Sequence, residues 1–130
     1  MESLQVRTGQ ISLRILDDSG EERGIFKFNP QDISAAKKLM ELQSELDIKN
    51  GEFQELANKC ETPEEKVKLL EDEVNYIEGL IDDCFGIGSS LVLFGNAKTL
   101  SMFYDFFDGI TPYYQKASKN RMDKYKKSKK

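Results

Sequence analysis

The clearest structural signal in the chain lies in residues 62–85, TPEEKVKLLEDEVNYIEGLIDDCF. Thr62 is a good helix-capping residue, Pro63 suits the first helical turn, and Glu65 completes a capping box. Apolar side chains then recur in alternating steps of three and four, the period of a helix that packs lengthwise against another helix. They are Val67, Leu70, Val74, Ile77, Ile81 and Cys84. The pattern predicts a helix that reaches about Phe85.

A second helix is predicted just before this one, from residue 31 to about residue 59. Asp32 stands near its start as a cap, and apolar residues again recur in steps of four and three. They are Ala35, Leu39, Leu42, Leu46, Phe53 and Leu56. Lys49 interrupts this seam, and Asn50-Gly51 marks a candidate kink or break. Because only a short segment separates the two helices, they are predicted to form an antiparallel hairpin.

Both helices also carry apolar residues outside their seams. These are Met40 and Ile48 on the first helix and Leu69, Tyr76 and Leu80 on the second. The apolar faces are therefore wider than one hairpin can bury. The excess is predicted to meet the C-terminal segment, another copy of the chain, or a client protein.

Two short strands are predicted ahead of the helices. Apolar and polar residues alternate over residues 11–16 and again over residues 24–28, as in half-buried strands. The charged segment 17–22 between them is typical of a hairpin loop, and Asn29-Pro30 ends the second strand. Residues 4–8 are predicted to add a third short strand.

The C-terminal part of the chain differs in composition from the two predicted helices. Residues 86–96 are apolar, rich in glycine and poor in charge, which predicts a buried passage. A helix is predicted over residues 99–108, with Gly109 at its end, and a last helix starts at Ile110. The predicted fold is therefore mainly α, of the α+β type, with an N-terminal β-hairpin or small sheet, a long antiparallel helical hairpin and two shorter C-terminal helices. Its predicted regions are 1–30, 31–115 and 116–130.

Composition indicates a single globular domain with a strongly solvated surface, because 38% of the 130 residues are hydrophobic and 32% are charged. Neither a leader-like start nor a stretch of about 20 apolar residues occurs, so the chain is predicted to be cytoplasmic. The net charge of -4 is unevenly distributed. Residues 116–130 hold eight Lys/Arg and one acid, a net of +7, which leaves -11 for residues 1–115.

The residues that catalysis usually requires are missing or scattered. The chain has no histidine, which excludes triads and His-ligated metals. Cys60 and Cys84 lie on different parts of the predicted hairpin, roughly 30 Å apart at 1.5 Å per helical residue, which excludes a disulfide between them. We therefore predict no catalytic residue, no metal site, no cofactor and no enzymatic activity.

Three polar features have structural interpretations that outweigh functional ones. The glycine-rich loop Gly86-Ile87-Gly88-Ser89 follows a helix instead of a strand, so helix termination is favoured over a phosphate cradle. The pairs Asp82-Asp83 and Asp105/Asp108 are more typical of a solvated face or a cap than of a catalytic dyad. The basic tail could bind nucleic acid with tyrosines for stacking, but the acidic body disfavours it.

Residues 81–95, IDDCFGIGSSLVLFG, followed by Leu100 and Phe103 to Phe107, resemble the tail assembly chaperones of long-tailed bacteriophages that infect Gram-positive hosts. Those sequences commonly show Phe-Gly, a second glycine, a small hydroxyl residue and then a hydrophobic-Phe-Gly step before a helix. The extended opening that ends in FKFNP, residues 26–30, and the long charged helix after it also fit. The order of elements matches over most of the chain, and the motif is specific over about residues 81–110. Ile87 departs from the pattern, because an acidic residue is more usual there.

The resemblance implies a protein without catalysis that coats the long, helical tape measure protein until the tail tube polymerises around it. The partner-binding residues are then expected to be Phe85, Leu91, Leu93, Phe94, Phe103, Phe106 and Phe107. The tail-tube protein and a second copy of the chain are further candidate partners, whereas no membrane partner is expected. The expected location is the cytoplasm of the bacterial host and not the mature virion. A helical adaptor or oligomerisation module, and a nucleic-acid-binding regulator that uses the basic tail, remain as alternatives.

Overall fold

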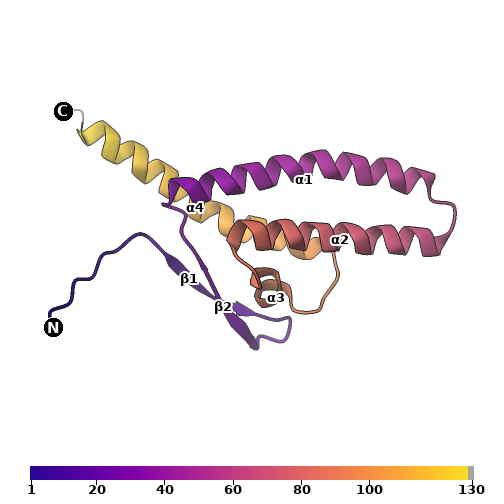
Figure 1. The fold of residues 1–130 in the computed structure, drawn as a ribbon, viewed down its shortest axis with the longest axis horizontal. Coiled ribbons are helices and arrows are strands. Elements are labelled where there is room, and N and C mark those ends of the chain that lie inside the picture. Colours follow the sequence, from indigo (N-terminus) through magenta and orange to yellow (C-terminus); the bar gives the residue numbers. More distant parts are fainter. Residues whose placement is uncertain (129–130) are drawn as a thin grey trace.

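The computed structural model describes residues 1–128, with side chains up to residue 123. An N-terminal β-hairpin is followed by two long helices packed side by side, a short helix and a long C-terminal helix (Figure 1). The chain is mainly α, as the sequence predicts. The elements are β1 (Ile11–Leu16), β2 (Glu22–Phe28), α1 (Ile33–Lys59), α2 (Pro63–Phe85), α3 (Ser89–Phe94) and α4 (Ser101–Ser128).

The two predicted strands pair antiparallel, with Leu13 opposite Phe26 and Ile11 opposite Phe28. The Asp17 side chain organises the turn between them, since its Oδ1 accepts hydrogen bonds from the amides of Ser19 and Glu21 at 2.9 Å each. The apolar side of the ribbon faces the helices, and this burial supplies the support that an isolated pair of strands lacks.

The predicted third strand over residues 4–8 is not formed. Gly9, two residues before the start of β1, has a φ of +99°. The backbone turns there, so residues 4–8 do not run alongside β1. The carbonyl of Thr8 also accepts a hydrogen bond from Asn29 Nδ2 at 3.0 Å, so the segment is held against the end of β2 instead.

The capping predictions for the helical hairpin are confirmed. Asp32 Oδ1 accepts hydrogen bonds from the amides of Ser34 and Ala35, at 2.9 and 3.3 Å, and caps α1. Thr62 Oγ1 accepts from the amide of Glu65 at 3.2 Å, while the Glu65 carboxylate reaches back to the amide that precedes the cap. The helix α1 is continuous through Asn50-Gly51, so the chain does not break there.

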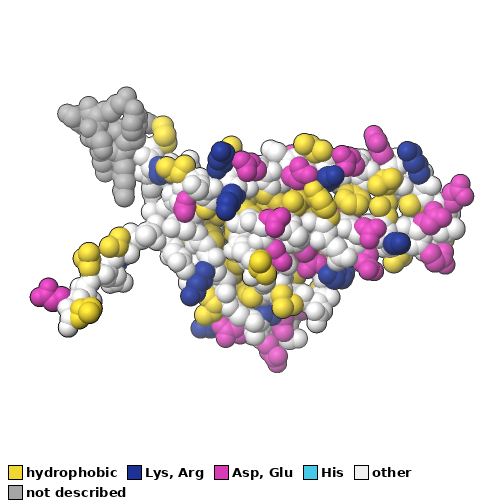
Figure 2. All heavy atoms as spheres, viewed as in Figure 1, with side chains coloured by type: hydrophobic (Ala, Val, Ile, Leu, Met, Phe, Trp, Pro, Cys, Tyr) yellow, Lys and Arg dark blue, Asp and Glu magenta, His cyan; other side chains and the backbone are white. Residues whose placement is uncertain are grey.

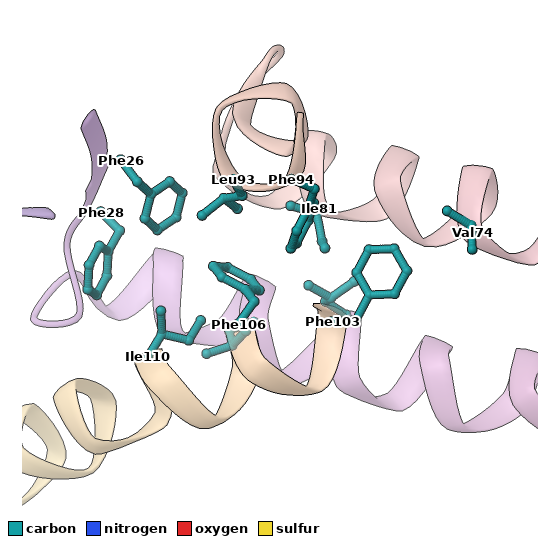
Figure 3. Packing of buried hydrophobic residues seen from close by; sticks show 11 residues of the cluster. Phe26, Phe28, Val74, Ile81, Leu93, Phe94, Phe103, Phe106 and Ile110 are labelled. Atoms are coloured by element: carbon teal, nitrogen blue, oxygen red, sulfur yellow. The ribbon is translucent and has the colours of Figure 1, made fainter. Parts of the chain in front are cut away.

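One cluster of buried apolar side chains joins all the elements (Figure 3). Strand β2, the facing sides of α1 and α2, the short helix α3 and the first half of α4 all contribute to it. Ile81 at its centre is 0% exposed. The buried members are Phe26, Phe28, Leu39, Leu42, Val74, Ile81, Leu93, Phe94, Phe103, Phe106 and Ile110.

The predicted helix boundary at Gly109 is wrong, because α4 runs without interruption through Gly109 and Pro112. A proline inside a helix costs about 3 kcal/mol, and a glycine about 1 kcal/mol. Burial of Ile110 and Ala117, which are 3% and 5% exposed, offsets this cost on both sides of the proline. The predicted tail 116–130 therefore continues α4 as far as Ser128, and its side chains from residue 124 onward lie outside the described part.

Hydrogen bonds tie the C-terminal half of α4 to the body before the helix extends outward (Figure 1). Arg121 Nη1 donates hydrogen bonds to the carbonyls of Pro30 and Gln31, at 3.2 and 3.3 Å. This contact joins α4 to the segment between β2 and α1.

Replacing Gly109 with alanine is expected to stabilise the chain by about 0.5 to 1 kcal/mol. Gly109 is exposed inside α4, and a Cβ added there meets no atom within 4 Å, so alanine only lowers the entropy lost on folding. Thermal unfolding followed by circular dichroism measures the change. Gly95→Ala is the contrasting control, because Gly95 has a φ of +62° and alanine there should destabilise. A loss of stability in Gly109→Ala would mean that α4 is broken at this residue.

Candidate binding groove

A groove of about 460 Å³ lies where the start of α4 meets the helical hairpin. Lys98, in the segment just before α4, links that segment to α2. Its Nζ donates hydrogen bonds to Glu78 and Asn75 at 2.6 and 3.0 Å. Three helical segments therefore contribute side chains to one concave surface. The lining residues are Gln43, Leu46, Asp47, Lys49, Asn50 and Phe53 from α1, Glu73, Tyr76 and Ile77 from α2, Leu100 just before α4, and Phe103, Tyr104 and Phe107 from the start of α4.

A small polar network fixes the side chains between α1 and α2. Tyr76 Oη donates a hydrogen bond to Glu45 Oε1 at 2.6 Å, and this bond raises the pKa of the phenol because the carboxylate holds its proton. Lys49 Nζ lies 5.4 Å from the centre of the Tyr76 ring and 3.1 Å from Glu52 Oε2. Lys49 thus makes a cation–π contact at the position where it interrupts the apolar seam of α1.

Apolar surface continues from the groove toward the tip of the hairpin. Leu56 on α1 and Val67 and Leu70 on α2 belong to the predicted seams, yet they remain 48%, 63% and 49% exposed. Neither α3 nor the described part of α4 reaches over them. Figure 2 shows a band of hydrophobic side chains that follows the junction between α1 and α2. The hairpin thus presents a long, narrow apolar surface.

The hairpin is also strongly acidic. Residues 41–78 hold twelve Asp/Glu and four Lys/Arg, a net of -8, and acidic side chains flank the apolar band in Figure 2. Two of these acids, Asp47 and Glu73, line the groove itself. Partial burial raises the pKa of Glu73, because the charged form loses water contacts. A partner with basic side chains at the edges of its apolar face would therefore complement this surface.

The structure divides the seven sequence-predicted partner residues among different environments. Phe103 and Phe107 line the groove, although Phe103 is 5% exposed and forms its floor. Leu91 is 61% exposed on α3. Phe85 is half-buried. Leu93, Phe94 and Phe106 are buried in the core, where they touch other parts of the chain.

In this structure those last three residues lie in the core and not on the surface. Phe94 packs edge-on against Phe103 and Phe106, with ring centroids 5.1 and 5.9 Å apart. Helix α3 brings these rings together, and β2 covers them with Phe26. Sequence reasoning missed Tyr104, which is 71% exposed at the edge of the groove. Its spacing of three residues from Phe107 on one helix face was the available signal.

The loop between α2 and α3 serves helix termination, as the sequence indicates. Gly86 has a φ of +114°, and its amide donates to the carbonyl of Asp82 at 2.8 Å to end α2. The Asp82 carboxylate accepts a hydrogen bond from the amide of Ser90 at 2.8 Å, so it caps the next helix. The capping interpretation of this aspartate is confirmed. Cys60 and Cys84 are both free thiols, as predicted.

The fold and the groove together define a mainly α protein with a small β-hairpin and an elongated apolar surface between acidic helix faces. The chain belongs to DUF6673, a family of unknown function, whose sequence model matches residues 22–130. The match begins in β2 and includes every helix, so it covers the groove and the hairpin. No curated protein and no solved structure matches the chain. Within residues 1–128, no helix is both long enough and apolar enough to cross a membrane.

Proposed function

We propose that this chain is a tail assembly chaperone that binds the tape measure protein of a long-tailed bacteriophage and keeps it soluble during tail-tube assembly. The observation that carries the proposal is the open apolar groove between the helical hairpin and α4, which continues along the hairpin toward its tip. A tape measure protein is a long amphipathic helix. Helical clients bind in grooves of this kind through apolar residues spaced three and four apart.

The geometry supports reversible binding better than permanent assembly. The groove is lined by a few aromatic side chains, Phe53, Tyr76 and Tyr104 among them, and its acidic rim limits the apolar area that a client can cover. Aromatic residues contribute much of the binding energy in protein interfaces, whereas rim charges mainly select the partner and the rate of encounter. Such a surface could hold a client helix and release it when the tube subunits compete for it.

The test is co-expression with the tape measure protein of the same phage. We expect the chain to raise the soluble fraction of the client and to co-purify with it. Tyr104→Asp is expected to weaken the complex by more than tenfold, because it places a carboxylate at the edge of the apolar groove. Met40→Asp is the matched control, since Met40 is similarly exposed at 68% but lies outside the groove.

The alternatives give different results in the same experiment. A client that stays insoluble and forms no complex would refute the chaperone proposal and favour a helical adaptor. Loss of the complex in Leu91→Asp, with Tyr104→Asp unaffected, would move the docking surface from the groove to α3. Salt-sensitive binding to nucleic acid that survives both substitutions would favour the regulator that uses the basic tail.

A further inference from the structure

Residues 1–8 leave the body of the protein as an extended arm (Figure 1). Leu4 and Val6 are 88% and 72% exposed, so the arm carries apolar side chains that cover nothing in this chain. Leu4, Val6 and Thr8 alternate with Gln5 and Arg7, which is the period of a β-strand with one apolar face. The arm therefore has the residue alternation of a β-strand but pairs with no strand of the described chain.

The base of the arm is fixed. Gly9 turns the backbone with a φ of +99°, and a Cβ at this position would lie only 2.7 Å from the Gln31 side chain. Asn29 holds the preceding residue through its hydrogen bond to the Thr8 carbonyl. The arm thus starts in a defined direction that carries it away from β1 of its own chain.

A matching acceptor lies on the other side of the β-hairpin. Strand β1 pairs with β2 alone in the described chain, so its second edge keeps unpaired amides and carbonyls. Two hollows of about 520 and 420 Å³ lie between β1 and α4 and share Tyr113. Ile11, Leu13 and Ile15 line them on the strand side, and Met102, Phe106 and Ile110 are among the α4 residues opposite. We call these two hollows the β1–α4 trough.

We propose that residues 4–8 of one copy bind as a third, antiparallel strand along the free edge of β1 in a second copy, and that two copies exchange their arms reciprocally. Gly9-Gln10 is the two-residue link that a hairpin between the arm and β1 would use, with glycine at its first position. Opening this link keeps the same strand pairs but forms them between chains, as in domain swapping.

The register of this exchange places the apolar side chains of the arm on the same face as the apolar side chains of β1. Antiparallel pairing across Gly9-Gln10 sets Thr8 opposite Ile11, Val6 opposite Leu13 and Leu4 opposite Ile15. Leu13 and Ile15 face the helices, so Val6 and Leu4 would enter the trough, while Gln5 and Arg7 would face solvent. A shift of one residue would expose both apolar side chains. The same strand therefore supplies hydrogen bonds to the edge and apolar cover for the trough.

Sedimentation velocity of the full chain tests the exchange. We expect a dimer for the native sequence and a rise of at least about 100-fold in its dissociation constant for Val6→Asp, because each of the two exchanged strands would bury a carboxylate. Gln5→Asp is the matched control, since it adds the same charge one residue away on the solvent face. Val6 is 72% exposed in the single chain, so the helical content should stay unchanged, and so should the unfolding temperature at concentrations where the native chain is monomeric.

Three outcomes would overturn the proposal. The native chain could remain monomeric up to its highest soluble concentration, or its dimer could survive Val6→Asp, or both substitutions could weaken the dimer equally. A cysteine pair separates exchange from folding back within one chain. Oxidation of the Val6→Cys/Leu13→Cys double variant should give a covalent dimer, with the two single variants as controls for the native thiols. A bond formed within one chain would also refute the exchange.

Discussion

Replacing Phe106 with alanine is expected to lower the free energy of unfolding by about 3 to 5 kcal/mol. The ring is 8% exposed and lies within 6 Å of four other aromatic rings, those of Phe26, Phe85, Phe94 and Phe107. Three of these contacts are edge-on, the arrangement that aromatic pairs favour. No neighbour can move into the space without breaking several such contacts at once, so a cavity should remain.

Urea unfolding followed by circular dichroism measures this loss, with an unchanged dependence on urea as evidence that the unfolded chain is the same. Tyr104→Ala is the matched control on the same helix. Tyr104 is 71% exposed, so its removal should change stability by no more than about 0.5 kcal/mol. Equal losses in the two variants would contradict the assignment of Phe106 to the core.

The contrast between Phe106 and Tyr104 also shows where sequence reasoning stops. Periodicity identified the apolar face of the segment after Thr99, because apolar residues recur there at helical spacing. It could not show which part of that face would be covered, since the cover comes from Phe26 on β2, eighty residues earlier. The buried and exposed aromatic residues look alike in sequence. Only tertiary contacts separate core from groove.

Local rules succeeded where the structure is determined locally. The caps at Asp32 and Thr62 require only a side chain and an amide a few residues away, so both were predictable. The prediction that a helix ends at Gly109 was wrong because the structure there is not determined locally. Helix propensity there is outweighed by the burial of Ile110 and Ala117, which depends on strands and helices far along the chain. The groove combines three helical segments and was likewise beyond local reasoning.

The exposed seams near the hairpin tip connect the fold with the proposed activity. The sequence predicted the two seams as the faces along which the helices pack, yet their members Leu56, Val67 and Leu70 remain exposed near the hairpin tip. A chain under selection for stability alone would gain from polar residues at these sites. Exposed apolar side chains flanked by the twelve acids of residues 41–78 are the kind of surface that the proposed client binding requires.

Raising the pH from about 9 to about 12 is expected to destabilise the folded chain through two half-buried groups. Burial raises the pKa of Cys84 from 9.0 to about 11 and that of Tyr114 from 10.0 to about 12. In this window the unfolded chain loses each proton before the folded chain does, so unfolding becomes more favourable as pH rises. Below about pH 8 both groups are protonated in both states, and their contribution no longer changes with pH.

Tyr114→Phe should remove most of the upper part of this pH dependence, between about pH 10 and 12. The upper limit of the effect is roughly 2 to 3 kcal/mol, reduced because solvent still reaches part of the ring. At neutral pH the same variant should be as stable as the native chain or about 1 kcal/mol more stable, because Tyr114 Oη is buried without a hydrogen-bond partner among the described residues. Denaturant titrations at pH 7, 9.5 and about 11.5 measure both effects. Tyr104→Phe, which alters an exposed ring, should follow the native curve, and a Tyr114→Phe curve that coincides with it would show that the phenol is accessible in the folded protein.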